Sequence, residues 1–193
     1  MEIVIILGLI FFNGILSMSE IAMVSARKSR LETAAKKGSK TAKTALRLAN
    51  EPDRFLSTIQ IGITLIGILT GLYSGEALAG DLARWLETIG IPQAHSLTLA
   101  KGIIVILVTY LTLILGELVP KHLGMNAPEK IARLIARPME VLSKIASPFV
   151  WLLSASTQAV IRLTGLHTST ENKVTEEEIK AIIQEGTEDG EIQ

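Results

Sequence analysis

The chain has 193 residues, of which 48% are hydrophobic, and its 19 basic and 19 acidic residues leave no formal net charge. It contains no cysteine, which excludes disulfides, thiolate metal sites and cysteine nucleophiles. The apolar residues are gathered in runs long enough to cross a bilayer, so we expect an all-α membrane protein.

The first apolar run, residues 3–24, predicts a membrane-spanning helix of roughly 20 residues. Its start has one acid and no basic residue, and no small-residue cleavage site follows, which is not typical of a removed signal peptide. Asn13, Ser17 and Glu20 share one helical face at i, i+4 and i+7. Ser19 lies away from that stripe, and a local π-bulge or unwinding would be needed to bring it round.

Two interpretations of this polar stripe stay open. Serine and asparagine in membrane helices commonly hydrogen-bond a neighbouring helix or their own backbone, and Glu20 could simply meet Arg27 or Lys28. Alternatively, the amide, hydroxyl and carboxylate oxygens are ligands of a hard cation such as Mg²⁺.

A basic loop and a second span follow. Residues 27–54 hold nine Arg or Lys and three acids, and we expect this loop to set the topology and attract anionic lipid headgroups. Few aromatics interleave with the charge, so no nucleic-acid partner is predicted. The second span covers residues 55–78, whose four glycines favour close packing in lipid. Gln60, Gly62 and Thr64 are candidates for lining the same cavity.

The third run, residues 97–119, leads into the string GELVPK at residues 116–121. An ionisable group at membrane depth is by default a functional-site hypothesis, which singles out Glu117. Pro120 has no N–H, so we expect it to break the helix, and the carbonyl of Gly116 then loses its donor and becomes a candidate cation ligand. The alternative is an ordinary i, i+4 salt bridge between Glu117 and Lys121.

The stretch at residues 139–161 is a weaker apolar segment, interrupted by polar groups. Pro138 and Pro148 would break one straight spanning helix. We therefore predict helices along the cytoplasmic interface, with Trp151 as an anchor, and keep a fourth span as the alternative.

The C-terminal residues 171–193 are acidic, with eight acids and two lysines. Thr175 and Glu178 form a capping box that predicts the start of a soluble helix. A solvated helix face is the simpler interpretation of these acids, and a divalent-cation sensor the sharper one.

Loop charge predicts the orientation, because basic loops stay in the cytoplasm. The loops before the second span and after the third are basic, so the N-terminus is expected outside and the C-terminus in the cytoplasm. We expect three parts, namely spans and loops at 1–137, juxtamembrane belt helices at 138–165, and the start of an acidic cytosolic helical bundle at 166–193.

Three strings resemble the membrane domain of the CorB/CorC and cyclin M family of magnesium transporters. They are SMSEIA at residues 17–22, TIQIGIT at 58–64 and GELVPK at 116–121, and the similarity covers nearly the whole chain. The resemblance implies three transmembrane helices, juxtamembrane helices and an acidic bundle. Paired CBS domains that bind ATP and Mg²⁺ usually follow, so we expect the chain to be cut from a longer protein before them.

The family is taken to be dimeric and to export Mg²⁺, with Na⁺ entry as the driving force. By resemblance, the ion pocket uses Asn13, Ser17, Ser19, Glu20, Gly116 and Glu117. Pro120 and Lys121 belong to the motif and are expected to be structural. The second span differs from animal members, which carry an asparagine near Ile63, so its ligand role stays open.

The sequence thus predicts a multi-pass plasma-membrane transporter for Mg²⁺ that works by alternating access as a homodimer. No catalytic triad, HExxH motif, P-loop or GxGxxG occurs, so no enzyme is predicted. The main alternative is a membrane-anchored sensor or regulator that binds Mg²⁺ and moves none. A second is a Na⁺-coupled carrier for another substrate, in which Glu117 binds Na⁺ or a proton.

Overall fold

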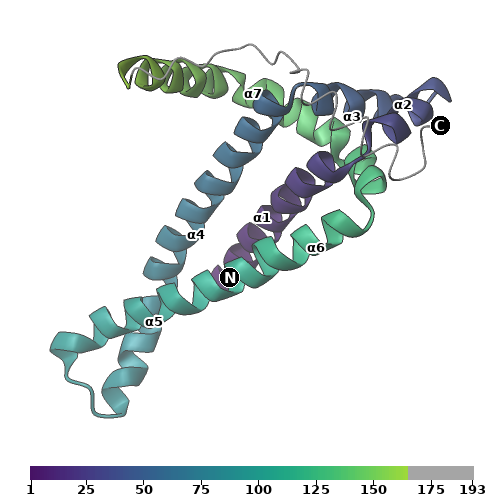
Figure 1. Cartoon of the computed structure of the whole chain (residues 1–193). Helices are drawn as coiled ribbons and strands as arrows, with labels where there is room; N and C mark the ends of the chain where they lie inside the picture. Colours follow the sequence, from purple (N-terminus) through teal and green to yellow (C-terminus); the bar gives the residue numbers. More distant parts are fainter. Residues whose placement is uncertain (165–193) are drawn as a thin grey trace, which may run out of the picture. The chain divides into compact units, whose positions relative to one another are not determined.

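The computed structural model describes residues 1–164, and every regular element among them is a helix (Figure 1). The predicted acidic helix with its capping box at Thr175 lies outside the described residues. The chain divides into one compact unit of residues 1–151 and a second that begins at Leu152. All candidate site residues belong to the first unit.

The elements follow the chain in a simple order. They are α1 (Glu2–Ser25), α2 (Lys28–Lys36), α3 (Lys40–Asn50), α4 (Pro52–Thr88), α5 (Gln93–Leu113), the π-helical turn η1 (Ile114–Leu118), α6 (Val119–Asn126) and α7 (Pro128–Leu163). Three helices are long and apolar enough to cross a membrane: α1, α4, and the continuous helix formed by α5, η1 and α6. This confirms the predicted fold class.

The outer faces of these three helices carry large apolar side chains that are exposed. Phe11 on α1, Leu72 on α4 and Ile106 on α5 are 70%, 64% and 73% exposed. An apolar surface of this extent is costly in water and is what the hydrocarbon of a bilayer covers. The chain is therefore a membrane protein.

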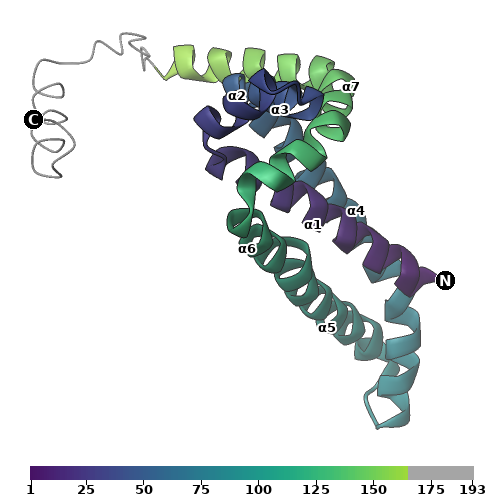
Figure 2. The ribbon, with the colours of Figure 1, turned by 90° about the vertical axis from the view of Figure 1, so that its right-hand side faces the viewer.

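The second span extends ten residues beyond its predicted end at residue 78. Ala79, Ala83 and Leu86 are buried in a cluster with Ala100 and Ile104 of α5. Packing against α5 thus continues the helix past the apolar run that marked it in the sequence. Figure 2 shows α4 and α5 joined by a short turn at the end remote from α2 and α3.

That turn needs glycine at one position. Gly90 has φ of +98°, a left-handed conformation that other residues adopt only at a steric cost. It follows the last residues of α4, where such a glycine commonly ends a helix.

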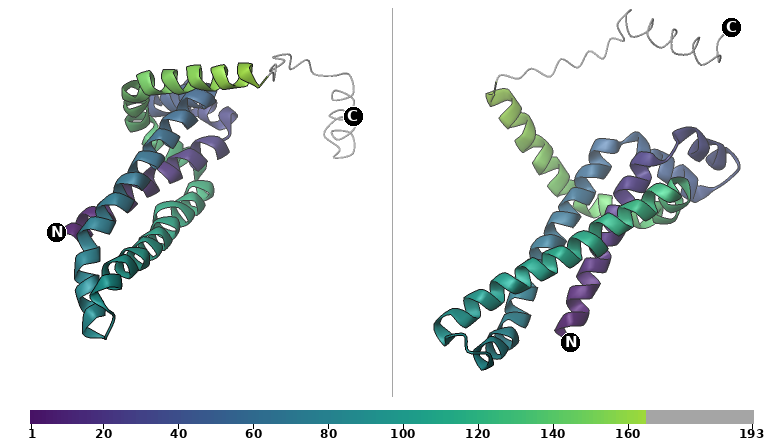
Figure 3. Two further views of the ribbon diagram at one scale, coloured as in Figure 1. Left: turned by 90° about the vertical axis from the view of Figure 1, so that its left-hand side faces the viewer. Right: turned by 60° about the horizontal axis from the view of Figure 1, so that its bottom comes forward.

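A second apolar cluster lies at the other end of the spans. It joins Leu16 of α1, Leu31 of α2, Ile59 of α4 and Ile135 of α7, all of them 5% exposed or less. The two short helices α2 and α3 and the first part of α7 are therefore anchored directly to the spans. Two views of this arrangement are given in Figure 3.

The expected break at Pro138 and Pro148 is wrong, since both prolines lie inside the continuous helix α7. Each removes one backbone hydrogen bond, at a cost of about 3 kcal/mol in an isolated helix. Buried residues on both sides of them, including Ala136, Met139 and Ala146, hold one face of the helix against its neighbours and offset that cost. Within residues 1–164, α7 is not among the helices apolar enough to span a membrane.

Candidate cation site

The site lies where α1 meets the third spanning helix, and glycines allow the contact. A Cβ on Gly14 would lie 3.1 Å from the carbonyl oxygen of Leu115 and 3.0 Å from Cγ of Pro120. A Cβ on Gly116 would lie 3.2 Å from the carbonyl oxygen of Ile10. The two backbones are therefore nearly in contact, and α1 runs beside η1 and α6 (Figure 1).

The third span is not broken at Pro120, contrary to the expectation from the sequence. Residues Ile114–Leu118 form a π-helical turn, in which the N–H of Val119 bonds the carbonyl of Ile114, and the helix then continues to Asn126. A π turn pairs each carbonyl with the N–H five residues on, so it tolerates a proline four residues after Gly116. The irregularity considered for the first span thus occurs in the third, while α1 is α-helical to Ser25.

The carbonyl of Gly116 has a partner from the opposite helix. Nδ2 of Asn13 donates to it at 3.0 Å across the contact, in a buried bond. A carbonyl oxygen has two lone pairs, so one remains for a further partner. The expected proximity of Asn13 and Gly116 is therefore present, although the carbonyl is not free.

Asn13 and Ser17 carry two buried oxygens without a protein partner among residues 1–164. Asn13 is 4% exposed and Ser17 is 0% exposed, and neither Oδ1 of the amide nor Oγ of the hydroxyl is hydrogen-bonded. Each such atom costs about 1–3 kcal/mol when it is buried unpaired. Simple helix packing, the plainer interpretation of these residues, leaves this cost unexplained. A cation coordinated by both oxygens would remove it.

Ser19 is also buried, at 0% exposure, but it faces its own helix. Its Oγ donates to the carbonyl of Ile15 at 2.6 Å. The structure therefore directs this hydroxyl to its own helix and not to the stripe of Asn13 and Ser17. The back-bond is the usual local partner of a serine in a membrane helix.

Two carboxylates from different helices meet at one ammonium. Nζ of Lys121 lies 2.7 Å from Oε1 of Glu117 and 3.8 Å from Oε2 of Glu20. These three side chains are 31%, 38% and 25% exposed. The i, i+4 pair of Glu117 and Lys121 is thus present, and Glu20 pairs with Lys121 rather than with a basic residue of the following loop.

The second span approaches α1 through Gly62, where a Cβ would lie 2.7 Å from Cδ1 of Leu16. Gln60 and Thr64, the other candidates on this span, are both exposed. The structure therefore brings the α4 backbone close to α1 without turning these two polar side chains to the site.

Sequence reasoning missed the shared lysine and one glycine contact. Glu20 and Glu117 are each the first charged residue after a long uncharged stretch of their helices, which was a signal that they lie at the same end of the spans. A Cβ on Gly124 would lie 2.8 Å from the carbonyl oxygen of Met18, so α6 also packs against α1 through its backbone. No pattern in the sequence marked that contact.

The chemistry of the site is that of oxygen ligands. Within residues 1–164 no group of three or more His, Cys, Asp or Glu side chains is placed to hold a metal ion. The cluster has two carboxylates and adds neutral amide, hydroxyl and carbonyl oxygens. Hard oxygen donors of this kind suit Mg²⁺ or Na⁺ better than zinc or copper.

Comparison with known proteins gives one family. The sequence model of one protein family, the cyclin M transmembrane N-terminal domain, matches residues 4–193. The UPF0053 protein sll0260 of Synechocystis is 46% identical over 192 residues, which are 100% of this chain and 43% of that protein. The UPF0053 protein YhdT of Bacillus subtilis is 31% identical, over 99% of this chain and 42% of the relative.

A further relative has a functional name. The polyamine export protein of Haemophilus influenzae is 30% identical over 97% of this chain and 43% of its own length. The chain spans less than half the length of these curated relatives.

Proposed function

We propose that this chain, which belongs to the cyclin M transmembrane N-terminal domain family, carries Mg²⁺ across the membrane. The observation that supports this most is the meeting of Glu20 and Glu117 from two helices, beside the unpaired buried oxygens of Asn13 and Ser17. Ionisable groups at membrane depth mark ion pathways in membrane proteins.

The ligand set fits a small divalent cation. Five residues offer oxygens there: Asn13, Ser17, Glu20, Gly116 and Glu117. Ser19 would be the sixth once its hydroxyl leaves the carbonyl of Ile15. Mg²⁺ demands six oxygens in octahedral geometry and gives up water reluctantly, so a full cage of protein oxygens is unusual for this ion and suits an occluded state of a transporter. Two carboxylates neutralise its charge, and the remaining donors are neutral.

Lys121 sets the charge of the site in this proposal. While its ammonium lies on Glu117 and Glu20, the cluster carries one net negative charge, which matches one Na⁺. When the lysine side chain withdraws, the two carboxylates carry two negative charges, which match one Mg²⁺. Movement of one flexible side chain thus offers a physical basis for exchanging Na⁺ for Mg²⁺ by alternating access.

Orientation and assembly are part of the same proposal. The basic loop of residues 27–54 favours a cytoplasmic face for α2 and α3, an outer N-terminus, and export across the plasma membrane. Gly67, Gly71 and Gly75 follow at intervals of four along α4, and a Cβ on any of them would meet nothing within 4 Å. Such a small-residue stripe favours helix association in lipid, which supports a homodimer. ATP-binding CBS domains would lie in the part of the relatives beyond this chain.

The test is Glu117→Gln, which keeps the shape of the side chain and removes its charge. Isothermal titration of the purified protein should show Mg²⁺ binding for the wild type and none for the variant, with both eluting as the same folded species. Glu76→Gln is the matched control, because Glu76 is an exposed acid of a spanning helix outside the cluster. Equal Mg²⁺ affinity in wild type and Glu117→Gln would defeat the assignment.

Flux separates a transporter from a sensor. Proteoliposomes with a trapped Mg²⁺ dye should report uptake that depends on an opposing Na⁺ gradient. Binding without flux would favour the membrane-anchored sensor. Flux without dependence on Na⁺ would remove the coupling from the proposal while leaving the Mg²⁺ site.

A second substrate is favoured by one observation. The cluster holds a primary ammonium, Nζ of Lys121, between two carboxylates, which is the arrangement that an amine substrate would use. The relative in Haemophilus influenzae is named a polyamine export protein. Competition of a linear diamine or triamine with Mg²⁺ in the titration, together with amine flux in proteoliposomes, would favour this alternative.

A further inference from the structure

A charged cavity lies between α3, α4 and α7, well separated in sequence from the cation site. Six polar residues line it: Arg47, Glu51, Arg54, Glu140, Ser143 and Lys144. Its volume is about 140 Å³. A water molecule takes up roughly 30 Å³ in the liquid, so the cavity has room for a tetrahedral phosphate group.

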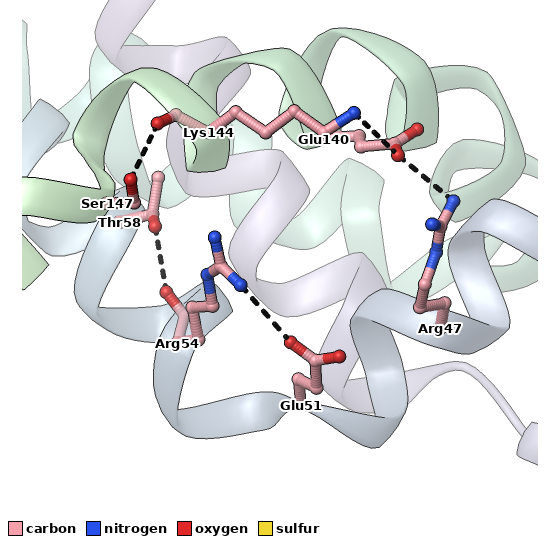
Figure 4. Close-up of polar contacts among 7 residues, drawn as sticks. All are labelled: Arg47, Glu51, Arg54, Thr58, Glu140, Lys144 and Ser147. Atoms are coloured by element: carbon pink, nitrogen blue, oxygen red, sulfur yellow. Dashed lines mark hydrogen bonds and ion pairs between the residues drawn. The ribbon is translucent and has the colours of Figure 1, made fainter.

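The cations of this cavity come from three helices, as Figure 4 shows. Arg47 of α3 lies 3.0 Å from Glu140 of α7, and Lys144 of α7 lies 3.2 Å from the same carboxylate oxygen. Arg54 of α4 has only a longer contact, 3.7 Å, with Glu51. Three cations against two carboxylates leave one net positive charge.

The three cationic side chains remain accessible in this arrangement. Arg47, Arg54 and Lys144 are 60%, 48% and 70% exposed, while Glu140 is 22% exposed. Exposed ion pairs are weak, in general about 0–1 kcal/mol, so an anion with several oxygens can compete for these donors. Guanidinium groups bind phosphate oxygens through paired hydrogen bonds, which gives Arg47 and Arg54 the right chemistry.

The cavity lies at the level of the lipid headgroups. Arg54 directly precedes residues 55–75, which carry no charge and reach as far as Glu76. A helix of this length spans about 31 Å, close to the roughly 30 Å hydrocarbon core of a bilayer. Arg54 therefore marks one boundary of that core.

An apolar stripe on α7 runs beside the charged groups. Leu134, Val141, Ile145 and Phe149 follow at i, i+7, i+11 and i+15, so they share one face, and they are 75%, 57%, 67% and 60% exposed. Val141 and Ile145 adjoin Glu140 and Lys144 in the chain. A cationic cavity at the headgroup boundary with an exposed apolar stripe next to it complements the two ends of a phospholipid.

The geometry points to a binding site for an anionic membrane phospholipid, whose phosphate enters the cavity of Arg47, Arg54 and Lys144 and whose acyl chains lie on the α7 stripe. This site holds the juxtamembrane part of α7 against the starts of the spans. It does not depend on which ion the chain transports.

Thermal unfolding in detergent tests this site, with short-chain phosphatidylglycerol, short-chain phosphatidylcholine or inorganic phosphate added to the chain. Phosphatidylglycerol should raise the midpoint of the wild type in a saturable way, and the other two should not. Arg54→Gln/Lys144→Gln should weaken the apparent affinity for phosphatidylglycerol by about tenfold or more, which corresponds to 1.4 kcal/mol. Lys40→Gln/Lys43→Gln removes the same charge from exposed residues of α3 outside the cavity and should retain the wild-type response.

Three outcomes would overturn the proposal: an equal loss in both double variants, which indicates general attraction to basic residues; an equal response to inorganic phosphate, which indicates a site for a free anion; or no response to phosphatidylglycerol. If the double variant fails to fold, Lys144→Gln alone gives the same comparison, because that side chain is the most exposed of the three. Lys43→Gln is then its matched control.

Discussion

Replacing Lys121 by methionine tests the charge balance of the cation site most directly. The change removes the ammonium that lies 2.7 Å from Glu117 and 3.8 Å from Glu20, while it keeps an unbranched side chain. A cation that binds both carboxylates in the wild type must displace this ammonium or tolerate its repulsion. The variant should therefore bind Mg²⁺ more tightly.

The size of the effect follows from the two distances. At an effective dielectric constant of about 20, Coulomb's law gives attractions of roughly 6 and 4 kcal/mol for the two contacts. Solvent screening and hydration of the released lysine reduce these values, because the three side chains are between 25% and 38% exposed. A hydrogen bond between charged groups contributes about 1.5–3 kcal/mol net, which corresponds to roughly a tenfold to hundredfold gain in affinity.

Isothermal titration with Mg²⁺ measures this gain, and Lys101→Met is the matched control. Lys101 is an exposed lysine of α5, so its removal should leave the affinity unchanged. Unchanged or weaker Mg²⁺ binding by Lys121→Met would refute the view that the carboxylates beside Lys121 hold the cation. Tighter binding with a lost dependence of flux on Na⁺ is the result expected if the lysine sets the exchange.

Three further outcomes follow from the same contacts. Ser17→Ala removes a buried hydroxyl without a protein partner, so thermal unfolding should show equal or higher stability, by up to about 1–2 kcal/mol, while titration shows weaker Mg²⁺ binding. Gly124→Ala places a Cβ 2.8 Å from the carbonyl oxygen of Met18 and should lower the stability by about 1–3 kcal/mol, whereas Gly102→Ala, with nothing within 4 Å, should be neutral or slightly stabilising. Glu140→Gln frees Arg47 and Lys144 and should tighten the binding of phosphatidylglycerol, measured by thermal shift; weaker binding would contradict the proposed competition.

The spans were predictable from the sequence because length and apolar character decide them. The first span, expected over residues 3–24, is the helix Glu2–Ser25. The extension of α4 to Thr88 was not predicted, because hydropathy alone marked the span while contacts of Ala83 and Leu86 with α5 continue the helix. Ala79, Ala83 and Leu86 do follow at i, i+4 and i+7, but this helical period lies beyond the apolar run that marked the span.

The prolines show where local rules give way to packing. Pro120 was expected to break its helix and to free the carbonyl of Gly116. The chain instead forms a π turn there, and Asn13 from another helix bonds the carbonyl. The approach of α1 that makes this bond depends on Gly14 and Gly116 together, and no single string shows it.

The glycines between α1 and the third span have a consequence for selectivity among ions. Glu20 and Glu117 belong to different helices, so the gap between them is fixed by main-chain proximity at Gly14, Gly116 and Gly124 rather than by the acids themselves. One added methyl group at these positions would widen the gap and favour a larger ionic radius. In the proposed site, discrimination by size would thus depend on three residues that have no side chain, of which only Gly116 offers the ion a ligand, its carbonyl oxygen.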